Sequence, residues 1–373
     1  MSRRRLVLAG GGHAQIHVLE DLARRTVDAA DVTLVSPTAR VTYTGMIPGA
    51  LAGLYAPEDA AIDVAALAAR CGARFVMDRV TGLRPAERLV ELERHGALAY
   101  DVLALDVGAQ PQHTAQVRGF AHVVPIKPIE DALPRIAAFL AAAERTPESP
   151  AAIVVGAGAG GVEVAFALRK RLGAPGSRVS LLERGATLLA GVAPRLRTLV
   201  ARLATRAGID VRLDAGEVAP SATGVTLGDG TAMTAGLVVW ATGAEGLPFV
   251  ARSGLRCDAR GFAVVDDFLR CTSAPEIFAA GDCSVLASAP WVPRAGVYAV
   301  RQGPVLARNV AAALAANARL TPFRPQRRFL KLLSTADRRA ILSYGPLALH
   351  GSVWWGLKDR IDRRFVARFT VRA

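Results

Sequence analysis

Two glycine-rich turns are the residues in this chain most suited to holding a phosphate. The first, Gly10–Gln15, follows the apolar run Leu6–Ala9 and leads into an apolar-periodic segment. The second, Gly156–Gly161, follows Ile153–Val155 in the same way. A strand that enters a glycine turn and continues as a helix lets the backbone approach a pyrophosphate and offers it free N–H groups. Each pattern therefore predicts a dinucleotide site.

The two turns match the G-x-G-x-x-G/A fingerprint unequally. The second has all three glycines, at Gly156, Gly158 and Gly161, whereas the first has Gly10 and Gly12 but Gln15 in the third place. One glycine-rich turn alone is a weak signal, because such turns are common. Two copies, each followed by a second strand at the expected distance, suggest that one nucleotide hands electrons to the other.

The residue that ends each second strand bears on the nucleotide's ribose. The strand over 179–183 ends at Glu183, whose carboxylate can accept bonds from both NAD ribose hydroxyls and repel the extra phosphate of NADP. The neighbouring Arg184 could serve that phosphate, so NADPH is the less favoured alternative to NADH. The strand over 32–36 ends at Ser36, which can bond a ribose but carries no charge.

Other small-residue turns fit a chain that passes close to a nucleotide. They are the turns at Gly108, at Thr242 and Gly243, and at Gly281 and Asp282. Asp282 could accept a bond from a sugar-like hydroxyl, cap the following helix, or do both. The segment Tyr43–Gly49, which contains Thr44 and Gly45, reads as a loop that is either a wall against a flat ring or an ordinary buried connection.

Composition limits the function classes. The 373 residues suffice for two medium domains and an extension, and the formal charge of +14 favours anionic partners or reflects a coding bias. No nucleic-acid motif is evident. The four cysteines form no C-x-x-C pair, so neither a zinc site nor a redox dithiol is indicated. No apolar run approaches the ~20 residues of a membrane span. The basic start Met1–Arg5 is not a signal peptide, so a cytoplasmic protein is expected.

The pattern of apolar segments predicts an α/β chain with two Rossmann-like domains. We place the first domain at 1–125 and 255–322, the second at 126–254, and a C-terminal extension at 323–373, with a linker at Thr146–Pro150. Strands are expected at 6–9, 32–36, 74–77, 89–92, 100–105, 153–155, 179–183, 237–240 and 276–279, and a strand with a tight turn at 225–230. Helices are expected after each glycine turn and at 62–69, 132–143 and 293–315.

The last segment has a different composition. On a helix, Trp354, Leu357, Ile361 and Phe365 would share one face, and Lys358, Arg360, Arg363 and Arg364 would line the other with Asp359 and Asp362. Tryptophan beside a cationic flank is typical of an interfacial helix, and packing on its own domain is the equal alternative.

These motifs together carry a resemblance. The chain resembles the FAD-dependent pyridine nucleotide-disulfide oxidoreductase superfamily over nearly its whole length, through Gly10–Ala14, Gly156–Glu163, Ala241–Gly243 and Ala280–Asp282 in that order. Within it, the chain is most similar to the type II NADH dehydrogenases, and closest to the branch associated with selenide, water dikinase. The segments Tyr43–Gly49 and Phe329–Thr335 and the run from Gly10 through His13 to Ala14 carry that narrower likeness.

The resemblance implies a glutathione reductase-like two-domain fold with FAD on the first turn and NADH on the second. NADH would be held through Gly156, Gly158, Gly161 and Glu163. Asp282 would touch the ribityl or phosphate region of FAD, and Ala295 and Gln302 would approach the isoalloxazine. Lys331 would stabilise the reduced flavin or a quinone oxygen. Disulfide reductases have a cysteine pair where this chain has the cysteine-free segment 41–51, and Cys283 reads as a buried thiol.

The expected function is hydride transfer from NADH to FAD, with electrons passed on to a quinone-like acceptor. The alternatives are a cytosolic flavoprotein reductase linked to selenium metabolism and a flavin- and NADH-binding sensor with little turnover. Peripheral contact with the inner face of the cell membrane through the C-terminal segment and a homodimer are left open, and no nucleic-acid partner is expected.

Overall fold

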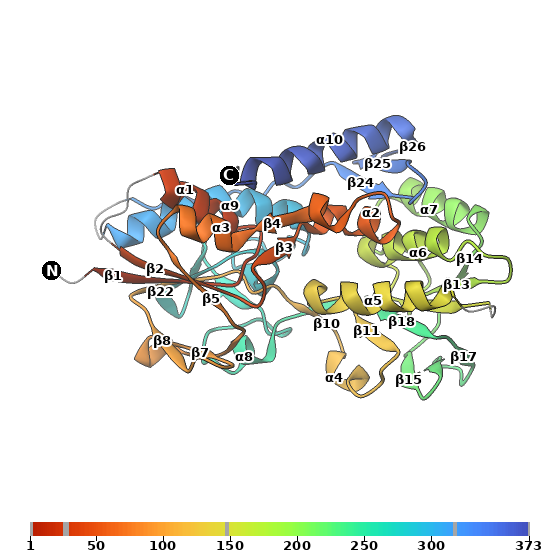
Figure 1. The fold of residues 1–373 in the computed structure, drawn as a ribbon, viewed down its shortest axis with the longest axis horizontal. Coiled ribbons are helices and arrows are strands. Elements are labelled where there is room, and N and C mark those ends of the chain that lie inside the picture. The colour runs from red at the N-terminus through yellow and green to blue at the C-terminus, as the bar shows by residue number, and fades with distance from the viewer. Residues whose placement is uncertain (1–2, 25–29, 146–148, 316–318, 372–373) are drawn as a thin grey trace.

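The computed structural model of the protein describes residues 3–24, 30–145, 149–315 and 319–371. The start of the basic segment Met1–Arg5 and most of the predicted linker Thr146–Pro150 lie outside these residues. Two sheets lie end to end along the molecule, and a long C-terminal helix runs above both (Figure 1). The α/β class predicted from the sequence is confirmed.

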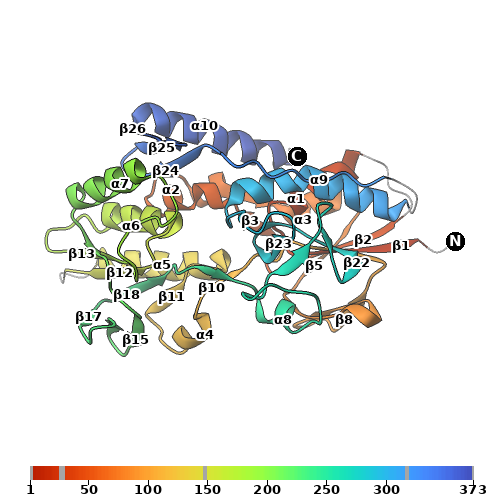
Figure 2. The ribbon, with the colours of Figure 1, turned by 180° about the vertical axis from the view of Figure 1, so that it is seen from behind.

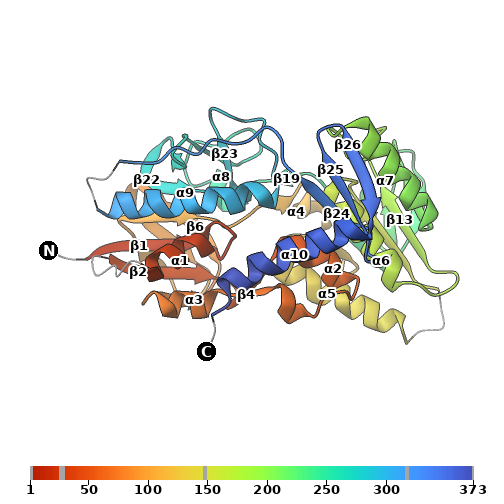
Figure 3. The same cartoon turned by 90° about the horizontal axis from the view of Figure 1, so that it is seen from above.

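The larger sheet has eight strands in the order β23-β20-β21-β22-β9-β1-β2-β5. Its centre is parallel and fully buried, since β1 pairs with β2 on one side and with β9 on the other. Helices α1, α3 and α9 cover one face, and a small sheet β6-β7-β8 lies on the other side (Figures 1 and 3). The bounds are β1 Arg4–Ala9, β2 Ala30–Ser36, β5 Arg74–Met77, β9 Val102–Leu105, β20 Ala263–Val265, β21 Arg270–Cys271, β22 Ala274–Ala279, β23 Ser284–Leu286, β6 Val80–Arg84, β7 Leu89–Leu92, β8 Ala97–Ala99, α1 Gln15–Arg24, α3 Val64–Arg70 and α9 Gly296–Leu314.

The second sheet has five parallel strands in the order β11-β18-β12-β13-β14. Its strands read as continuous apolar runs because both faces are covered, by α5, α6 and α7 on one side and by β15-β16-β17 on the other (Figure 2). The bounds are β11 Val123–Pro125, β12 Ala151–Val155, β13 Arg178–Leu182, β14 Ile209–Arg212, β18 Leu237–Trp240, α5 Ile129–Ala143, α6 Ala159–Arg171, α7 Pro194–Arg206, β15 Ala219–Ser221, β16 Gly224–Thr226 and β17 Ala232–Thr234.

The second sheet is an insertion in the first. The larger sheet takes strands from both sides of it in the sequence, and the two crossings pair as antiparallel strands β10 (Gln110–Pro111) and β19 (Ala244–Glu245). Short helices α4 (Thr114–Val117) and α8 (Pro248–Ala251) follow these crossings. The second sheet starts at β11, just before the predicted boundary at residue 126.

The C-terminal extension forms a three-stranded sheet and a helix. The strands are β24 (Lys331–Ser334), β25 (Ala340–Tyr344) and β26 (Leu347–Gly351), and α10 spans Ser352–Phe369. Helix α10 runs from this sheet to α1, so it crosses both domains (Figure 3). Among the described residues, no helix combines the length and the apolar character needed to cross a membrane.

The predicted faces of α10 are partly wrong. Ile361 is 44% exposed, and the buried positions are Trp355, Lys358, Asp362, Val366 and Phe369. Lys358 and Asp362 were expected on the charged outer face, but they are buried because they pair with each other across one helical turn.

Two local predictions also need correction. The predicted loop Tyr43–Gly49 is a 3₁₀ turn η1 (Thr44–Met46) followed by helix α2 (Ile47–Leu51), because its proline lies in the first helical turn, where proline is tolerated. The helix predicted from Ile62 starts at Val64. Residues Ala61–Asp63 form β4, paired with β3 (Arg40–Thr42), and Asp63 caps the helix by accepting the Ala66 N–H. Three further 3₁₀ turns are η2 (Pro57–Ala60), η3 (Pro85–Glu87) and η4 (Gly281–Cys283).

Candidate functional site

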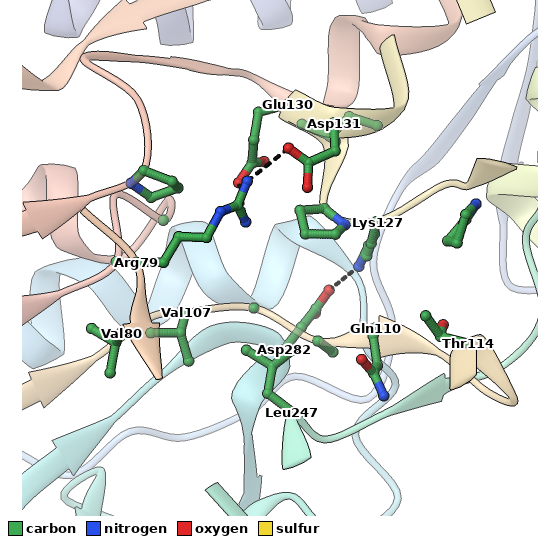
Figure 4. A pocket seen from close by; sticks show the side chains of 18 of the residues that line it. Arg79, Val80, Val107, Gln110, Thr114, Lys127, Glu130, Asp131, Leu247 and Asp282 are labelled. Atoms are coloured by element: carbon green, nitrogen blue, oxygen red, sulfur yellow. Dashed lines mark hydrogen bonds and ion pairs between the residues drawn. The ribbon is translucent and has the colours of Figure 1, made fainter. Parts of the chain in front are cut away.

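A cleft of about 1140 Å³ follows the carboxyl ends of the parallel strands of the larger sheet. Ligand pockets commonly measure ~300–1,000 Å³, so this volume suits a ligand as large as a dinucleotide. In open α/β sheets this edge is where ligands bind. The lining comes from the segments after β1, β2, β5 and β9, from the start of α5, from α4 and α8, and from Asp282, Arg294 and Gly296 (Figure 4).

The first glycine turn lines this cleft with exposed backbone donors. Gly10 has a φ of +98°, and a Cβ there would collide with the Asp106 carbonyl oxygen. A Cβ at Gly12 would collide with the Asp106 carboxylate. Within the described part of the chain, the N–H groups of Gly11, Gly12 and His13 donate no hydrogen bond to the protein. They are therefore available to an anionic ligand at the helix N-terminus.

Asp106 is a residue of this site that the sequence motifs did not indicate. Its Oδ2 accepts the N–H groups of Ala14 at 2.7 Å and of Gln15 at 3.1 Å. Burial raises the pKa of Asp106 to about 7, and nearby Asp282 adds to that rise. Gln15, which replaces the third fingerprint glycine, turns inward and donates to the Ala104 carbonyl at 2.7 Å. An acid between a buried strand and Gly108, which has a φ of +74° and lines the cleft, is the signal that could have found it.

The far end of the cleft lies by β2. The Ser36 hydroxyl is buried and donates to the Thr38 carbonyl at 2.9 Å. Arg79 extends across the opening and pairs with Asp131 at 2.7 Å, with Glu130 beside it at 3.9 Å (Figure 4). A polar, partly charged rim of this kind suits the ribose and base of a nucleotide.

Asp282 reaches the middle of the cleft and pairs with Lys127 (Figure 4). Lys127 is a second site residue that the sequence motifs did not predict, because a single lysine after β11 matches no binding motif. Asp282 lies in the 3₁₀ turn η4, which α9 stabilises on the side away from the cleft. There the Gly281 N–H donates to the buried Gln302 side chain at 2.7 Å. Gln302 thus supports the turn and does not line this cleft, and Ala295 precedes α9 beside a smaller cavity.

Arg294 lines the same cleft from a largely buried position. Its side chain is only 10% exposed and lies over the Phe262 ring, 3.9 Å from the ring centre. Its Nε and Nη2 atoms have no hydrogen-bond partner in the described residues, and burial lowers the pKa of this guanidinium. These two nitrogens are themselves buried, and the Asp258 carboxylate lies 4.0 Å from Nη2, so Arg294 contributes positive charge to the cleft wall.

The inner wall of the cleft meets the C-terminal helix. His13 accepts the Thr44 N–H at 3.3 Å, and burial lowers the pKa of His13 to about 4, so the ring is neutral. The His13 ring contacts those of Tyr43 and Phe365, at centroid distances of 5.3 and 6.2 Å. The Gly45 carbonyl accepts a hydrogen bond from the Lys358 ammonium group at 2.6 Å.

The second glycine turn has the spacing of a complete fingerprint. A Cβ at Gly156, where φ is +104°, would collide with the Ala241 carbonyl, and a Cβ at Gly161 with the Gly156 carbonyl. A Cβ at Gly158 meets nothing within 4 Å, so the turn is open there. Glu183 closes it by accepting the Ala157 N–H at 2.9 Å.

The neighbouring Ala241–Gly243 turn packs on the inter-domain crossing. The Thr242 hydroxyl donates to the Gln112 carbonyl at 2.8 Å, and the Gly243 carbonyl accepts the Gln112 N–H at 2.6 Å. These residues and the second glycine turn do not line the large cleft. They lie at the carboxyl ends of β12, β13 and β18, the edge of the other sheet where the sequence predicts the second nucleotide.

Two predicted site residues are placed elsewhere. Glu163 accepts the Ser334 N–H of the C-terminal sheet at 2.7 Å, and burial raises its pKa to about 7, so it faces the extension and is not gathered with Glu183. Lys331 holds its ammonium 5.0 Å from the centre of the Phe329 ring and does not line the cleft. The buried cation of this region is Lys358, which a helical projection assigns to solvent.

The cysteines do not form a relay. All four are free thiols, and Cys283 is buried, as expected, with its Sγ 3.1 Å from the Ala280 carbonyl. Burial raises the pKa of Cys283 to about 12, which keeps the thiol protonated. No group of three or more His, Cys, Asp or Glu side chains among the described residues is arranged to hold a metal ion.

The chain is similar to known proteins over most of its length. The family model described as pyridine nucleotide-disulphide oxidoreductase matches residues 4–311. The chain is 25% identical over 342 residues to the type II NADH:quinone oxidoreductase NdhA of Mycobacterium tuberculosis, covering 83% of this chain and 72% of that protein. It is 27% identical over 370 residues to the alternative NAD(P)H-ubiquinone oxidoreductase C1 of Arabidopsis thaliana, covering 87% and 70%.

Solved structures share the fold over almost the whole chain. NDH2 from Plasmodium falciparum, determined in complex with NADH, has a TM-score of 0.77 at 16% identity and covers 98% of this chain and 97% of its own. The sulfide:quinone oxidoreductase of Aquifex aeolicus has a TM-score of 0.77 at 18% identity and covers 98% and 91%.

Proposed function

The chain belongs to the pyridine nucleotide-disulphide oxidoreductase family, and from that membership we propose that it passes electrons from NADH through FAD to a quinone. It is an FAD-dependent enzyme that oxidises NADH. The observation that carries the proposal is the pair of nucleotide edges in one chain, one on a cleft of dinucleotide size and the other closed by a carboxylate.

The residues of the large cleft fit FAD. The free N–H groups of Gly11, Gly12 and His13 would hold its pyrophosphate, and Asp282, steadied by Lys127, would hold its sugar-like chain. The Arg294 guanidinium in the cleft lining would add positive charge near the anionic groups of the cofactor. Bound FAD supplies the redox chemistry, and the protein supplies binding, orientation and electrostatics.

The second edge fits NADH better than NADPH. Both oxygens of Glu183 are already aligned by backbone N–H groups, from Ala157 at 2.9 Å and from Gly185 at 3.2 Å. A carboxylate so fixed can still accept bonds from ribose hydroxyls, and it repels a 2′-phosphate. Glycines at the turn leave room for the pyrophosphate at Gly158.

We place the quinone between η1, α2 and α10. The aromatic rings of Tyr43 and Phe365 contact His13 there and give this wall of the cleft an aromatic surface on which a quinone ring could stack. Reduction of a quinone to a quinol consumes two protons. Glu163, with a pKa near 7, and Lys358, whose charge acts on it, would supply and relay them.

We also propose that the C-terminal sheet rests on a membrane surface, where quinones dissolve. Leu347 and Leu349 share one face of β26 and are exposed, Tyr344 is exposed at the end of β25, and Val353 at the start of α10 is 73% exposed. Exposed arginines at the neighbouring β24–β25 turn would meet anionic lipid.

The function is tested by anaerobic titration of the purified protein with NADH while the visible flavin spectrum is followed. We expect prompt bleaching by NADH, weaker bleaching by NADPH, and recovery of the colour on adding a water-soluble quinone. A protein without flavin colour, or one that NADH does not bleach, would refute the assignment. Bleaching without recovery by any quinone would refute the acceptor alone.

The membrane contact is tested by sedimentation with vesicles that contain anionic lipid. The double variant Leu347→Glu and Leu349→Glu should lose co-sedimentation. Leu213→Glu, an equally exposed leucine after β14, is the matched control and should keep it. If the double variant and the Leu213→Glu control bind the vesicles equally, the membrane contact lies elsewhere or does not exist.

A further inference from the structure

Asp106 is the point where the two motifs of the large cleft meet. It directly follows β9 and is almost fully buried. A Cβ at Gly12, in the first glycine turn, would collide with its carboxylate, and so would a Cβ at Gly281, which has a φ of +67°. Its Oδ2 also accepts the N–H groups of Ala14 and Gln15 at the start of α1. One carboxylate thus packs against both turns and caps the helix.

The second nucleotide edge gives an internal comparison. Gly156 packs on the Ala241 carbonyl at the end of β18 as Gly10 packs on the Asp106 carbonyl at the end of β9. Ala241 carries no acid, and a Cβ at Gly158 meets nothing within 4 Å. The second turn is held by a carboxylate from elsewhere, since Glu183, directly after β13, accepts the Ala157 N–H. A carboxylate packed directly against the turn's second glycine distinguishes the first turn from the second.

The Asp106 carboxylate and a bound pyrophosphate would both be stabilised by the same helix N-terminus, that of α1. A helix N-terminus carries a partial charge of about +0.5. Asp106 already compensates this charge by accepting two N–H groups of the terminus. The charged groups around it do not favour a further anion. Asp282 is an acid, and its partner Lys127 is engaged by that acid. His13 is neutral, and Cys283 is a buried thiol. The remaining cation, Arg294, lies over the Phe262 ring with Asp258 4.0 Å away. Two anions this close in a buried site repel strongly.

We propose that FAD binding at the first glycine turn is coupled to uptake of one proton by the Asp106 carboxylate, which positions the turn as a neutral acid in the loaded enzyme. The proton comes from water, and no other bond is made or broken. The inference rests on the proposed function in one respect, that FAD occupies this cleft.

The burial that raises the pKa of Asp106 to about 7 sets the direction of the effect. Below pH 7 the acid is already protonated, and FAD binds with no proton cost. Above pH 7 the free protein loses that proton, so Asp106 must take up a proton from water when FAD binds. Affinity then falls about tenfold per pH unit until the pKa of the loaded form is reached.

The experiment uses the holoprotein and measures flavin release, not turnover. A dilution series at pH 6 to 9 gives the FAD dissociation constant from the rise in free flavin fluorescence. For the wild type we expect FAD to bind on the order of 10- to 100-fold more weakly at pH 9 than at pH 6. Asp106→Asn, which keeps an acceptor but no charge, should give a constant that does not change over this range.

A matched control lies just before the other end of β9. Asp101 pairs with Arg5 at the surface, 3.1 Å away, and Asp101→Asn should keep the wild-type pH dependence. A second measurement needs no variant, because release of FAD by the wild type at pH 8 should free close to one proton, read with an indicator dye in weak buffer. A wild-type constant that varies less than twofold, an unchanged slope in Asp106→Asn, or no released proton would overturn the inference. A purified protein without FAD would overturn the cofactor assignment as well.

Discussion

The ion pair beneath α10 offers the sharpest test of how the extension is held. Lys358 and Asp362 are 7% and 6% exposed, and their charged atoms lie 2.7 Å apart. The same ammonium donates to the Gly45 carbonyl at 2.6 Å, which ties α10 to the first domain. Lys358→Met keeps the length of the side chain but removes the charge and both hydrogen bonds.

The expected cost follows from burial. Removing one partner of a buried pair leaves an uncompensated charge, which costs about 3–5 kcal/mol of unfolding free energy. Replacing both partners with apolar residues is often nearly neutral. The double variant Lys358→Met and Asp362→Leu should therefore be more stable than Lys358→Met alone. Burial raises the pKa of Asp362, so in the single variant this acid will take up a proton more readily.

The assay is urea unfolding followed by tryptophan fluorescence, since Trp354 and Trp355 both lie on α10. The same helix supplies the control. Arg363 and Asp359 also form an i,i+4 pair, at 2.9 Å, but they are exposed, so Arg363→Met should cost under about 1 kcal/mol. A Lys358→Met variant no less stable than this control, or a double variant less stable than the single, would refute the reasoning.

Three further outcomes are expected. Gly161→Ala would drive its Cβ into the carbonyl of the turn's first glycine and should weaken NADH binding at least tenfold, whereas Gly160→Ala, whose Cβ meets nothing within 4 Å, should leave it within about twofold in the same flavin titration. Lys127→Met leaves Asp282 without its cation and should lower the flavin-to-protein absorbance ratio after gel filtration; an unchanged ratio would contradict the role of the pair. Glu163 has a folded pKa raised to about 7 from an ordinary 4.5, so the stability it contributes is full below pH 4.5 and is lost as the pH rises through 7. Glu163→Gln should therefore lose less melting temperature between pH 5 and pH 8 than the wild type, and equal losses would argue against that raised pKa.

Local patterns in the sequence predicted much of the fold. The strands at 74–77 and 89–92 have the predicted bounds because each is a short apolar run flanked by polar residues or turn signals. Both glycine turns follow buried strands as the fingerprint requires, and the family and its cofactors are confirmed. The error at Tyr43–Gly49 arose because glycine and proline also suit the first turn of a short helix.

The rest depends on contacts between distant residues, which no local pattern encodes. Asp106 caps a helix that starts some ninety residues earlier in the chain, and Lys127 finds its partner 155 residues away. A helical projection predicts that Lys358 is exposed because the residue is charged. The projection cannot show the Gly45 carbonyl, which accepts a hydrogen bond from the buried ammonium group. Glu163 looked like part of the NADH turn because its true neighbour, Ser334, belongs to the extension.

The insertion of one sheet into the other also sets the order in which the protein can be completed during synthesis. The five strands of the inserted sheet all lie within residues 123–240, whereas β9 waits for its second neighbour until residues 274–279 have been made. Domains fold as units as the chain emerges from the ribosome, so the domain that begins first closes last. The large cleft lacks Asp282 and the start of α9 until these later residues have been made as well. Loading of the cofactor is therefore a late event, and the nascent chain carries an open sheet edge while the ribosome makes the inserted domain.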